Sequence, residues 1–177
     1  MAQVWQADSS VQRDDSTVAP FRGLRAFEQS WRRLEVAATR GDALELAAAS
    51  ASAARACLTD GDLDEAQWHL QRGGRFLSLH DTCPRGLTLQ CELAEVTLRL
   101  ADCLADEDEH AARRLRDDTR DTLFEVVRRV QAVREHGAMT SALLHVADLL
   151  AALGDHSDAE TVRTLALQGM ASASLSN

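Results

Sequence analysis

Lysine, isoleucine and tyrosine are missing from this sequence of 177 residues, and all 19 of its basic residues are arginine. The absence of lysine excludes a P-loop lysine, a Schiff-base lysine for pyridoxal phosphate and a lysine nucleophile. Proline occurs only twice, while alanine and leucine dominate, so helix-forming residues greatly outnumber strand-forming ones. These features predict an all-α fold, and the length is that of one domain with an ample core.

Acidic residues outnumber basic ones, which gives a formal net charge of -9. Nonspecific nucleic-acid binding requires a basic surface that releases counterions from phosphates, so we expect no nucleic-acid partner. No apolar run approaches the roughly 18 residues of a membrane span, and the N-terminal residues, with Asp8, Asp14 and Asp15, are unlike a signal peptide. We therefore expect a cytoplasmic protein without a membrane partner, whose partners are basic or amphipathic proteins.

A six-residue framework occurs twice, as Gly-Asp-Leu-Asp-Glu-Ala at 61–66 and as Gly-Asp-His-Ser-Asp-Ala at 154–159. Small residues lie in register with both copies, seven positions before and twelve positions after each glycine: Ala54 and Ala147, then Gly73 and Ala166. Each copy predicts a helix, a turn and a second helix, with small residues where the two helices touch closely.

The turns in these two copies carry start and stop signals for helices. Glycine tolerates the left-handed backbone that commonly ends a helix, so Gly61 and Gly154 are predicted helix ends. Three residues further on, Asp64 and Ser157 are predicted to cap the next helix, since their side chains can accept hydrogen bonds from its first N–H groups.

These residues resemble the tetratricopeptide family of helical repeats, whose consensus turn is glycine-aspartate-aromatic-aspartate-glutamate-alanine. The first copy departs from it only at Leu63, and the resemblance covers about 47–80 and 140–172. It implies antiparallel helix-turn-helix repeats in a short solenoid of about six to seven helices. In the middle, 101–106 echoes 147–152 without a following glycine, so we interpret that segment as a degenerate repeat with longer helices.

The expected organisation is a disordered N-terminal arm over 1–20, a single all-α repeat domain over 21–171 and a flexible tail over 172–177. Apolar spacing and turn signals place the helices of the domain. Their expected ranges are 21–40, 43–59, 64–79, 87–105, 109–136, 140–153 and 157–170.

The resemblance further implies that the first helix of each pair lines a groove. Groove residues implied in this way are Ala51, Arg55, Leu58, Glu95, Arg99, Asp102, Leu144 and Asp148. An arginine there can clamp a partner carboxylate through two parallel hydrogen bonds, although a solvated helix face explains the same charges equally well. We therefore expect a non-enzymatic interaction module, of an adaptor, regulatory or chaperone-like kind, that binds a peptide or helix.

Two alternatives concern other uses of the helices. Phe124 and Val127 lie beside the main apolar stripe of the helix 109–136, so this helix can pair within its own chain or support a homodimer. Glu92 and Glu95 share a helix face and are faintly similar to the carboxylate helix of all-α nucleotide pyrophosphohydrolases, which bind magnesium.

The four cysteines are too widely spaced for a disulfide scaffold, and we expect reduced thiols. Cys57 and Cys103 fall in apolar helical segments and are predicted to pack in the core. His80, Cys83 and Cys91, with His69 nearby in sequence, have ligand-type side chains but no metal-binding spacing. We expect neither a metal nor a cofactor.

Overall fold

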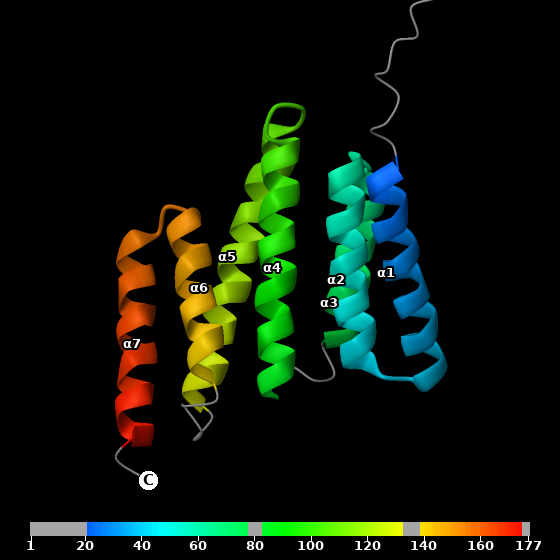
Figure 1. Cartoon of the computed structure of the whole chain (residues 1–177). Coiled ribbons are helices and arrows are strands. Elements are labelled where there is room, and N and C mark those ends of the chain that lie inside the picture. The colour runs from blue at the N-terminus through cyan, green and yellow to red at the C-terminus, as the bar shows by residue number, and fades with distance from the viewer. Residues whose placement is uncertain (1–20, 78–82, 133–138, 175–177) are drawn as a thin grey trace, which may run out of the picture.

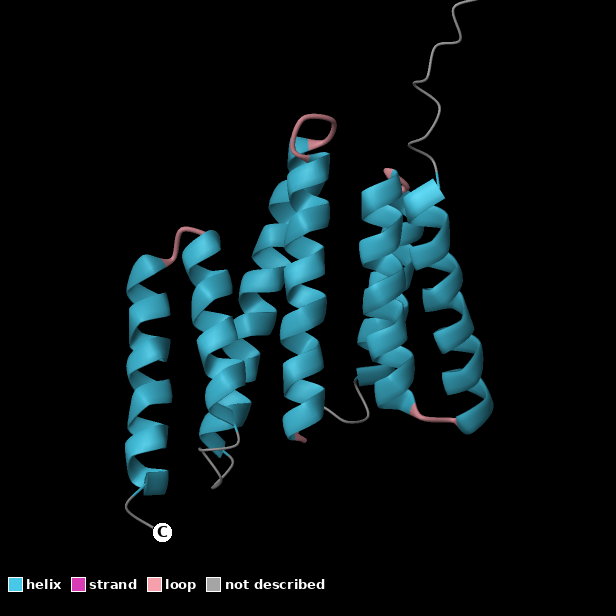
Figure 2. Ribbon diagram, in the orientation of Figure 1, coloured by secondary structure: helices cyan, strands magenta, loops and turns pink. Residues whose placement is uncertain are grey.

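The computed structural model describes residues 21–77, 83–132 and 139–174, with side chains over 28–77, 83–132 and 139–171. Within these ranges all regular structure is helical, which confirms the predicted all-α class (Figure 2). The seven helices of the described chain are α1 (Phe21–Arg40), α2 (Ala43–Asp60), α3 (Leu63–Leu77), α4 (Pro84–Leu104), α5 (Glu109–Ala132), α6 (Thr140–Ala152) and α7 (His156–Ser174). None of the described helices is long and apolar enough to cross a membrane.

The helices form three hairpins that lie side by side, α2–α3, α4–α5 and α6–α7, with α1 packed on α2 at one end (Figure 1). In this view α2 lies in front of α3, and α4 lies in front of α5. The central helix α4 packs on four others, namely α2, α3, α5 and α6. Extensive contacts therefore join each hairpin to the next through α4.

The turns of the first and last hairpins have the same backbone geometry. Gly61 and Gly154 are left-handed, with φ of 80° and 88°. In each turn the N–H of the following aspartate donates to the carbonyl five residues earlier, at 2.9 Å, and the glycine N–H donates to the carbonyl three residues earlier. This pair of hydrogen bonds is a Schellman motif, which satisfies the last carbonyls of a helix.

The predicted N-caps Asp64 and Ser157 are wrong, because both residues lie inside the first helical turn. Helix α3 begins one residue after Asp62, whose carboxylate accepts a hydrogen bond from the N–H of Glu65 at 3.1 Å. The Schellman turn is so short that the aspartate next to the glycine already occupies the cap position. Helix α7 likewise begins directly after Asp155.

The middle hairpin reaches the same arrangement through a turn that needs no glycine. Its connection spans 105–108, and Ala105 keeps a right-handed backbone. Asp108 caps α5 by accepting a hydrogen bond from the N–H of Ala111 at 2.9 Å. The longer turn gives the chain room to reverse direction without a left-handed residue.

Buried small residues occupy corresponding positions in all three hairpins when these are aligned on the aspartate before the second helix. Four residues after it stand Ala66, Ala112 and Ala159, each 0% exposed, and seven residues later stand the buried Gly73, Thr119 and Ala166. The first helices contribute the fully buried Ala54 and Ala147, each eight residues before this aspartate, and Ala101, seven residues before it. The match of Ala101 with Ala147 was predicted from the similarity of 101–106 to 147–152, whereas the matches at Ala112 and Thr119 were not predicted, because the middle turn has no glycine.

Helix α4 begins earlier than the predicted range of 87–105. Pro84 stands in its first turn, where proline is favoured because its missing N–H would have no partner and its φ is already helical. Cys83 precedes it as the N-cap, and its Sγ accepts a hydrogen bond from the N–H of Gly86 at 3.2 Å. Pro84, which lies before the predicted range, therefore starts the helix.

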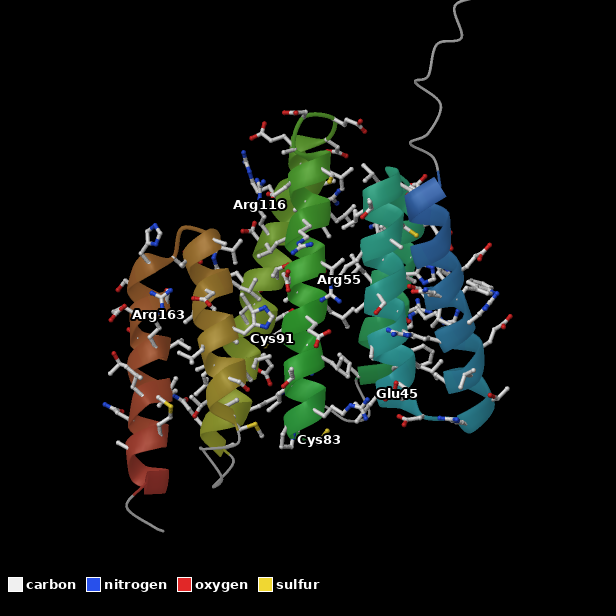
Figure 3. The ribbon with its side chains drawn as sticks, in the orientation of Figure 1. Glu45, Arg55, Cys83, Cys91, Arg116 and Arg163 are labelled. Atoms are coloured by element: carbon white, nitrogen blue, oxygen red, sulfur yellow. The ribbon has the colours of Figure 1, made fainter. Side chains whose placement is uncertain are left out.

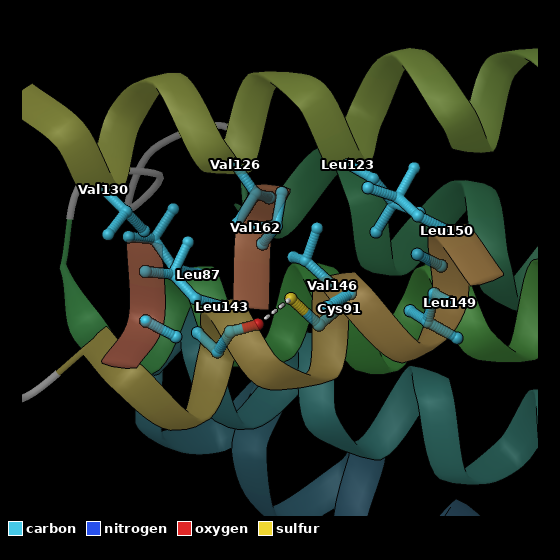
Figure 4. Close-up of a cluster of buried hydrophobic side chains, with 14 of the residues drawn as sticks. Leu87, Cys91, Leu123, Val126, Val130, Leu143, Val146, Leu149, Leu150 and Val162 are labelled. Carbon is cyan, nitrogen blue, oxygen red and sulfur yellow. Dashed lines mark hydrogen bonds between the residues drawn. The ribbon is translucent and has the colours of Figure 1, made fainter. Parts of the chain in front are cut away.

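The core is built from two large apolar clusters that share α4 and α5. One joins α4, α5, α6 and α7 and includes Leu87, Leu123 and Val146, each 0% exposed (Figure 4). The other joins α2, α3, α4 and α5. Phe124 and Val127 are half-buried against the first cluster, so both side chains pack within their own chain. These two residues therefore give no support to the alternative of a homodimer.

Some expectations concern residues at or beyond the limits of the described chain. The N-terminal arm over 1–20 and the end of the long helix at 136 lie outside the described residues. Helix α7 continues to Ser174, which is past the expected end of the domain at 171. The last three residues of the expected tail lie outside the described residues.

Candidate partner-binding site

Three of the residues expected to bind a partner meet on the face formed by α2, α4 and α6. The Arg55 guanidinium lies 4.0 Å from the Glu95 carboxylate, and Arg99 lies 2.6 Å from it (Figure 3). Glu92 and His145, which were not on that list, join the same network at 3.7 Å from Arg55 and 3.5 Å from Glu95. Arg55, Glu95 and Arg99, three of the charged residues of the implied groove, thus form one network of ion pairs.

Two further expected residues, Asp102 and Asp148, tie a first helix to the second helix of its own hairpin. Asp102 pairs with Arg116 at 2.9 Å, and Asp148 pairs with Arg163 at 3.1 Å (Figure 3). Each aspartate directly follows a fully buried alanine, so the two ion pairs occupy corresponding places. Both side chains are 72% exposed, so each pair contributes at most about 1 kcal/mol to stability.

The apolar residues of the expected groove do not form one accessible surface. Ala51 is 0% exposed within the α2–α4 core, so it offers no surface to a partner, contrary to expectation. Leu58 is half-buried against the same core. Leu144 is 37% exposed and is the most accessible of the three. The close packing of small residues that joins the hairpins also buries Ala51.

The thiol and imidazole groups have separate structural settings. Cys91 is fully buried, its Sγ donates to the carbonyl of Ala142 at 3.9 Å, and burial raises its pKa to about 12. Cys83 lies at the start of α4, two helical turns from Cys91 (Figure 3). Over the described residues no group of three or more His, Cys, Asp or Glu side chains is arranged to hold a metal ion. His80 lies outside the described residues.

Cys57 and Cys103 differ in burial, although both were predicted to pack in the core. Cys57 is 3% exposed, as predicted, and burial raises its pKa to about 11. Cys103 is exposed, so that prediction is wrong. It stands four residues after the exposed Arg99, and residues four apart share a helix face, so Cys103 follows the solvent side of α4.

The carboxylates behind the pyrophosphohydrolase alternative are already neutralised by a cation from the protein. The Arg55 guanidinium is within 4.0 Å of both Glu92 and Glu95, and His145 approaches Glu95 from α6. A guanidinium beside these carboxylates repels a magnesium ion and occupies the same oxygens. This geometry gives the enzymatic alternative no support.

A hollow lies on the other side of α4, between α3 and α5. It is a groove of about 780 Å³, in the range of sites that hold ligands. Its walls are Gln67, Leu70, Gln71, Gly74 and Leu77 from α3, and Leu115, Asp118, Thr119, Asp121, Thr122, Glu125 and Arg129 from α5. Its floor is Gln90, Leu93, Ala94, Thr97 and Leu100 from α4.

The two walls of this groove differ in charge. The α3 wall has no ionisable side chain, whereas the α5 wall has three carboxylates and one guanidinium. Glu125 pairs with Arg129 at 2.8 Å, and the hydrogen bond from Arg129 lowers the pKa of Glu125. Asp118 and Asp121 are exposed, and neither carboxylate is paired with a cation among the described residues. The groove is therefore apolar at its base and acidic along one edge.

The repeat pattern of the sequence did not predict this groove, although α3 carries a signal of it. Gln67, Gln71 and Gly74 are spaced by four and three residues, so they share one helix face with Leu70 and Leu77, which line the same groove. Gly74 lies inside the helix, and a Cβ atom added to it would meet nothing within 4 Å. A glycine in the middle of a helix and next to open space indicates a hollow beside that helix.

The chain matches no family model, and none of the curated protein sequences matches it.

Proposed function

We propose that this protein is a tetratricopeptide-like, non-enzymatic interaction module that binds a peptide or helix in the groove between α3 and α5. The observation that carries the proposal is the apolar-floored groove of about 780 Å³. Covering the groove would remove the accessible part of its apolar lining from water, and burial of apolar surface is the main driving force of association. The corresponding buried positions of the three hairpins support the family resemblance, and stacked helices hold such a groove in shape before a partner arrives.

This proposal moves the binding site away from the face that the resemblance implied. On the α2–α4–α6 face, Arg55, Glu95 and Arg99 satisfy one another, and a partner would have to break or cover these ion pairs. Covering paired charges removes them from water, and this cost offsets much of the attraction. The groove between α3 and α5 has no comparable network of charges on its α3 wall or its floor.

A selection from a random peptide library tests the proposal with two variants. Gly74→Leu fills the groove at a position where the added side chain meets open space, and Leu144→Glu alters the exposed α6 side of the other face. Peptides selected on the wild type should lose about tenfold or more in affinity on Gly74→Leu and keep their affinity on Leu144→Glu. The reverse result would place the site on the α2–α4–α6 face. Failure to enrich any peptide over a blank surface would overturn the proposed function.

A further inference from the structure

The acidic edge of the groove follows a regular spacing along α5. Asp118, Asp121 and Glu125 are separated by three and four residues, so they form one row that climbs the helix by about 4.5 Å and then about 6 Å. A second helix lying alongside α5 presents its own residues at the same intervals. An extended peptide advances about 3.3 Å per residue with alternating sides and does not match this row.

Two carboxylates in this row remain open to a cation from a partner. Glu125 is already paired with Arg128 and Arg129, at 2.8 Å in each case. Asp118 and Asp121 have no cation among the described residues and stand three positions apart, where like charges on a helix repel. A partner cation placed between them would relieve this repulsion, so binding would favour a basic residue at that point.

The base of the groove supplies the apolar contacts for a bound helix. The half-buried Thr97 of α4 and Leu115 of α5 provide its accessible surface. Leu70, Leu93 and Leu100 line the base but are at most 9% exposed. An apolar stripe of an approaching helix fits such a base, which is the helix-in-groove mode of recognition. The uncharged α3 wall, with Gln67 and Gln71, requires no charge on the opposite edge of the partner.

We infer that the partner of this groove is an amphipathic helix with arginine or lysine along one edge, which lies beside Asp118 and Asp121. This inference rests on the proposed function and specifies the chemistry of its partner. The bound helix places its apolar stripe on α4 and its basic edge against α5. The net charge of -9 of the whole chain draws such a partner toward the protein at long range.

Three synthetic peptides of about 18 residues, roughly five helical turns, test this inference by fluorescence anisotropy. The first is a leucine–lysine amphipathic helix, the second has glutamate in place of each lysine, and the third is the lysine peptide with two central prolines. At about 0.15 M salt the lysine peptide should bind at least tenfold more tightly than either of the others. Equal binding of the proline-containing peptide would overturn the helical form of the partner.

Charge-neutralising variants separate recognition at the groove from general attraction to an acidic protein. The double variant Asp118→Asn, Asp121→Asn should weaken binding of the lysine peptide about tenfold or more. The matched control, Asp106→Asn, Glu107→Gln, makes the same change of net charge in the exposed α4–α5 turn and should leave affinity within about twofold. Equal losses in the two variants would overturn the inference, as would full affinity of the lysine peptide on Gly74→Leu.

The library selection distinguishes failure of this inference from failure of the proposed function. Selected peptides that are acidic or neutral, and that Gly74→Leu still excludes, would overturn the basic helix as the partner and leave the groove as the binding site. A library that yields no binder of any composition would overturn the proposed function itself.

Discussion

His69 is fully buried in α3, and neither ring nitrogen has a hydrogen-bond partner among the described residues. The Trp68 ring packs edge-on against it, with ring centroids 4.8 Å apart. Burial lowers the pKa of His69, the nearby Glu65 carboxylate partly opposes this change, and Arg72 adds to it. The folded protein therefore holds the imidazole neutral at a pH where the unfolded chain would bind a proton.

This difference predicts a loss of stability in mild acid. Below the unfolded pKa of 6.5 the unfolded chain binds a proton that folded His69 does not, so the free energy of unfolding falls as the pH is lowered. Urea unfolding between pH 8 and pH 5 should show this fall in the wild type and a shallower fall in His69→Leu. Identical pH profiles for the two proteins would contradict the assignment to His69.

The cysteines should differ in reactivity according to burial. Cys57 and Cys91 are buried with pKa values raised to about 11 and about 12, so few thiolates form at neutral pH, whereas Cys103 is exposed. Brief treatment of the folded protein with a maleimide should modify Cys103 and leave Cys57 and Cys91 unmodified, as measured by peptide mapping. After unfolding in urea all three should react. Modification of Cys91 as fast as Cys103 in the folded protein would contradict its burial.

At the scale of single helices, the neighbouring glycines Gly73 and Gly74 of α3 differ in the space beside them. A Cβ atom on Gly73 would lie 2.9 Å from Leu93 Cδ2 and 3.3 Å from Ser50 Cβ, whereas one on Gly74 would meet nothing within 4 Å. Gly73 therefore allows α3 to approach α2 and α4 closely, as its spacing from Gly61 predicted. Gly74 leaves space in the groove.

Leucine at these two positions should change stability in opposite directions. Gly73→Leu is expected to lower the free energy of unfolding by about 1–3 kcal/mol through overpacking. Gly74→Leu is expected to raise it by roughly 0.5–1 kcal/mol, because glycine inside a helix is less favourable than leucine by about that amount. Urea midpoints of the two variants and the wild type measure both effects. A change of the same sign in both variants would contradict the packing of α3.

The helices could be predicted from sequence because their signals are local. Apolar spacing and the glycine turns gave the order of the helices and most bounds to within a few residues. The errors were also local: Asp62 rather than Asp64 caps α3, and Pro84 starts α4. At α3 either aspartate could cap the helix, and the short turn after Gly61 places Asp62 in the cap position.

At the scale of the whole molecule, the sequence predicted residues of the α2–α4–α6 face but did not predict the groove between α3 and α5. Arg55, Glu95 and Arg99 were placed together because family spacing assigns residues to a face of each helix. The groove depends instead on how far α3 stands from α5, which is set by the packing of two hairpins on α4. No single segment of the sequence determines the distance between α3 and α5.

The contacts between the hairpins also determine the order in which the fold can open. Among the described residues, extensive helix contacts join elements that are adjacent or next but one along the chain, and α1 and α7 each make extensive contacts with one helix, α2 and α6. Short-range contacts of this kind favour rapid folding that can start in any hairpin. Opening therefore proceeds inward from both ends and reaches α4 last, so the slowest amide hydrogen exchange belongs to the middle of the chain.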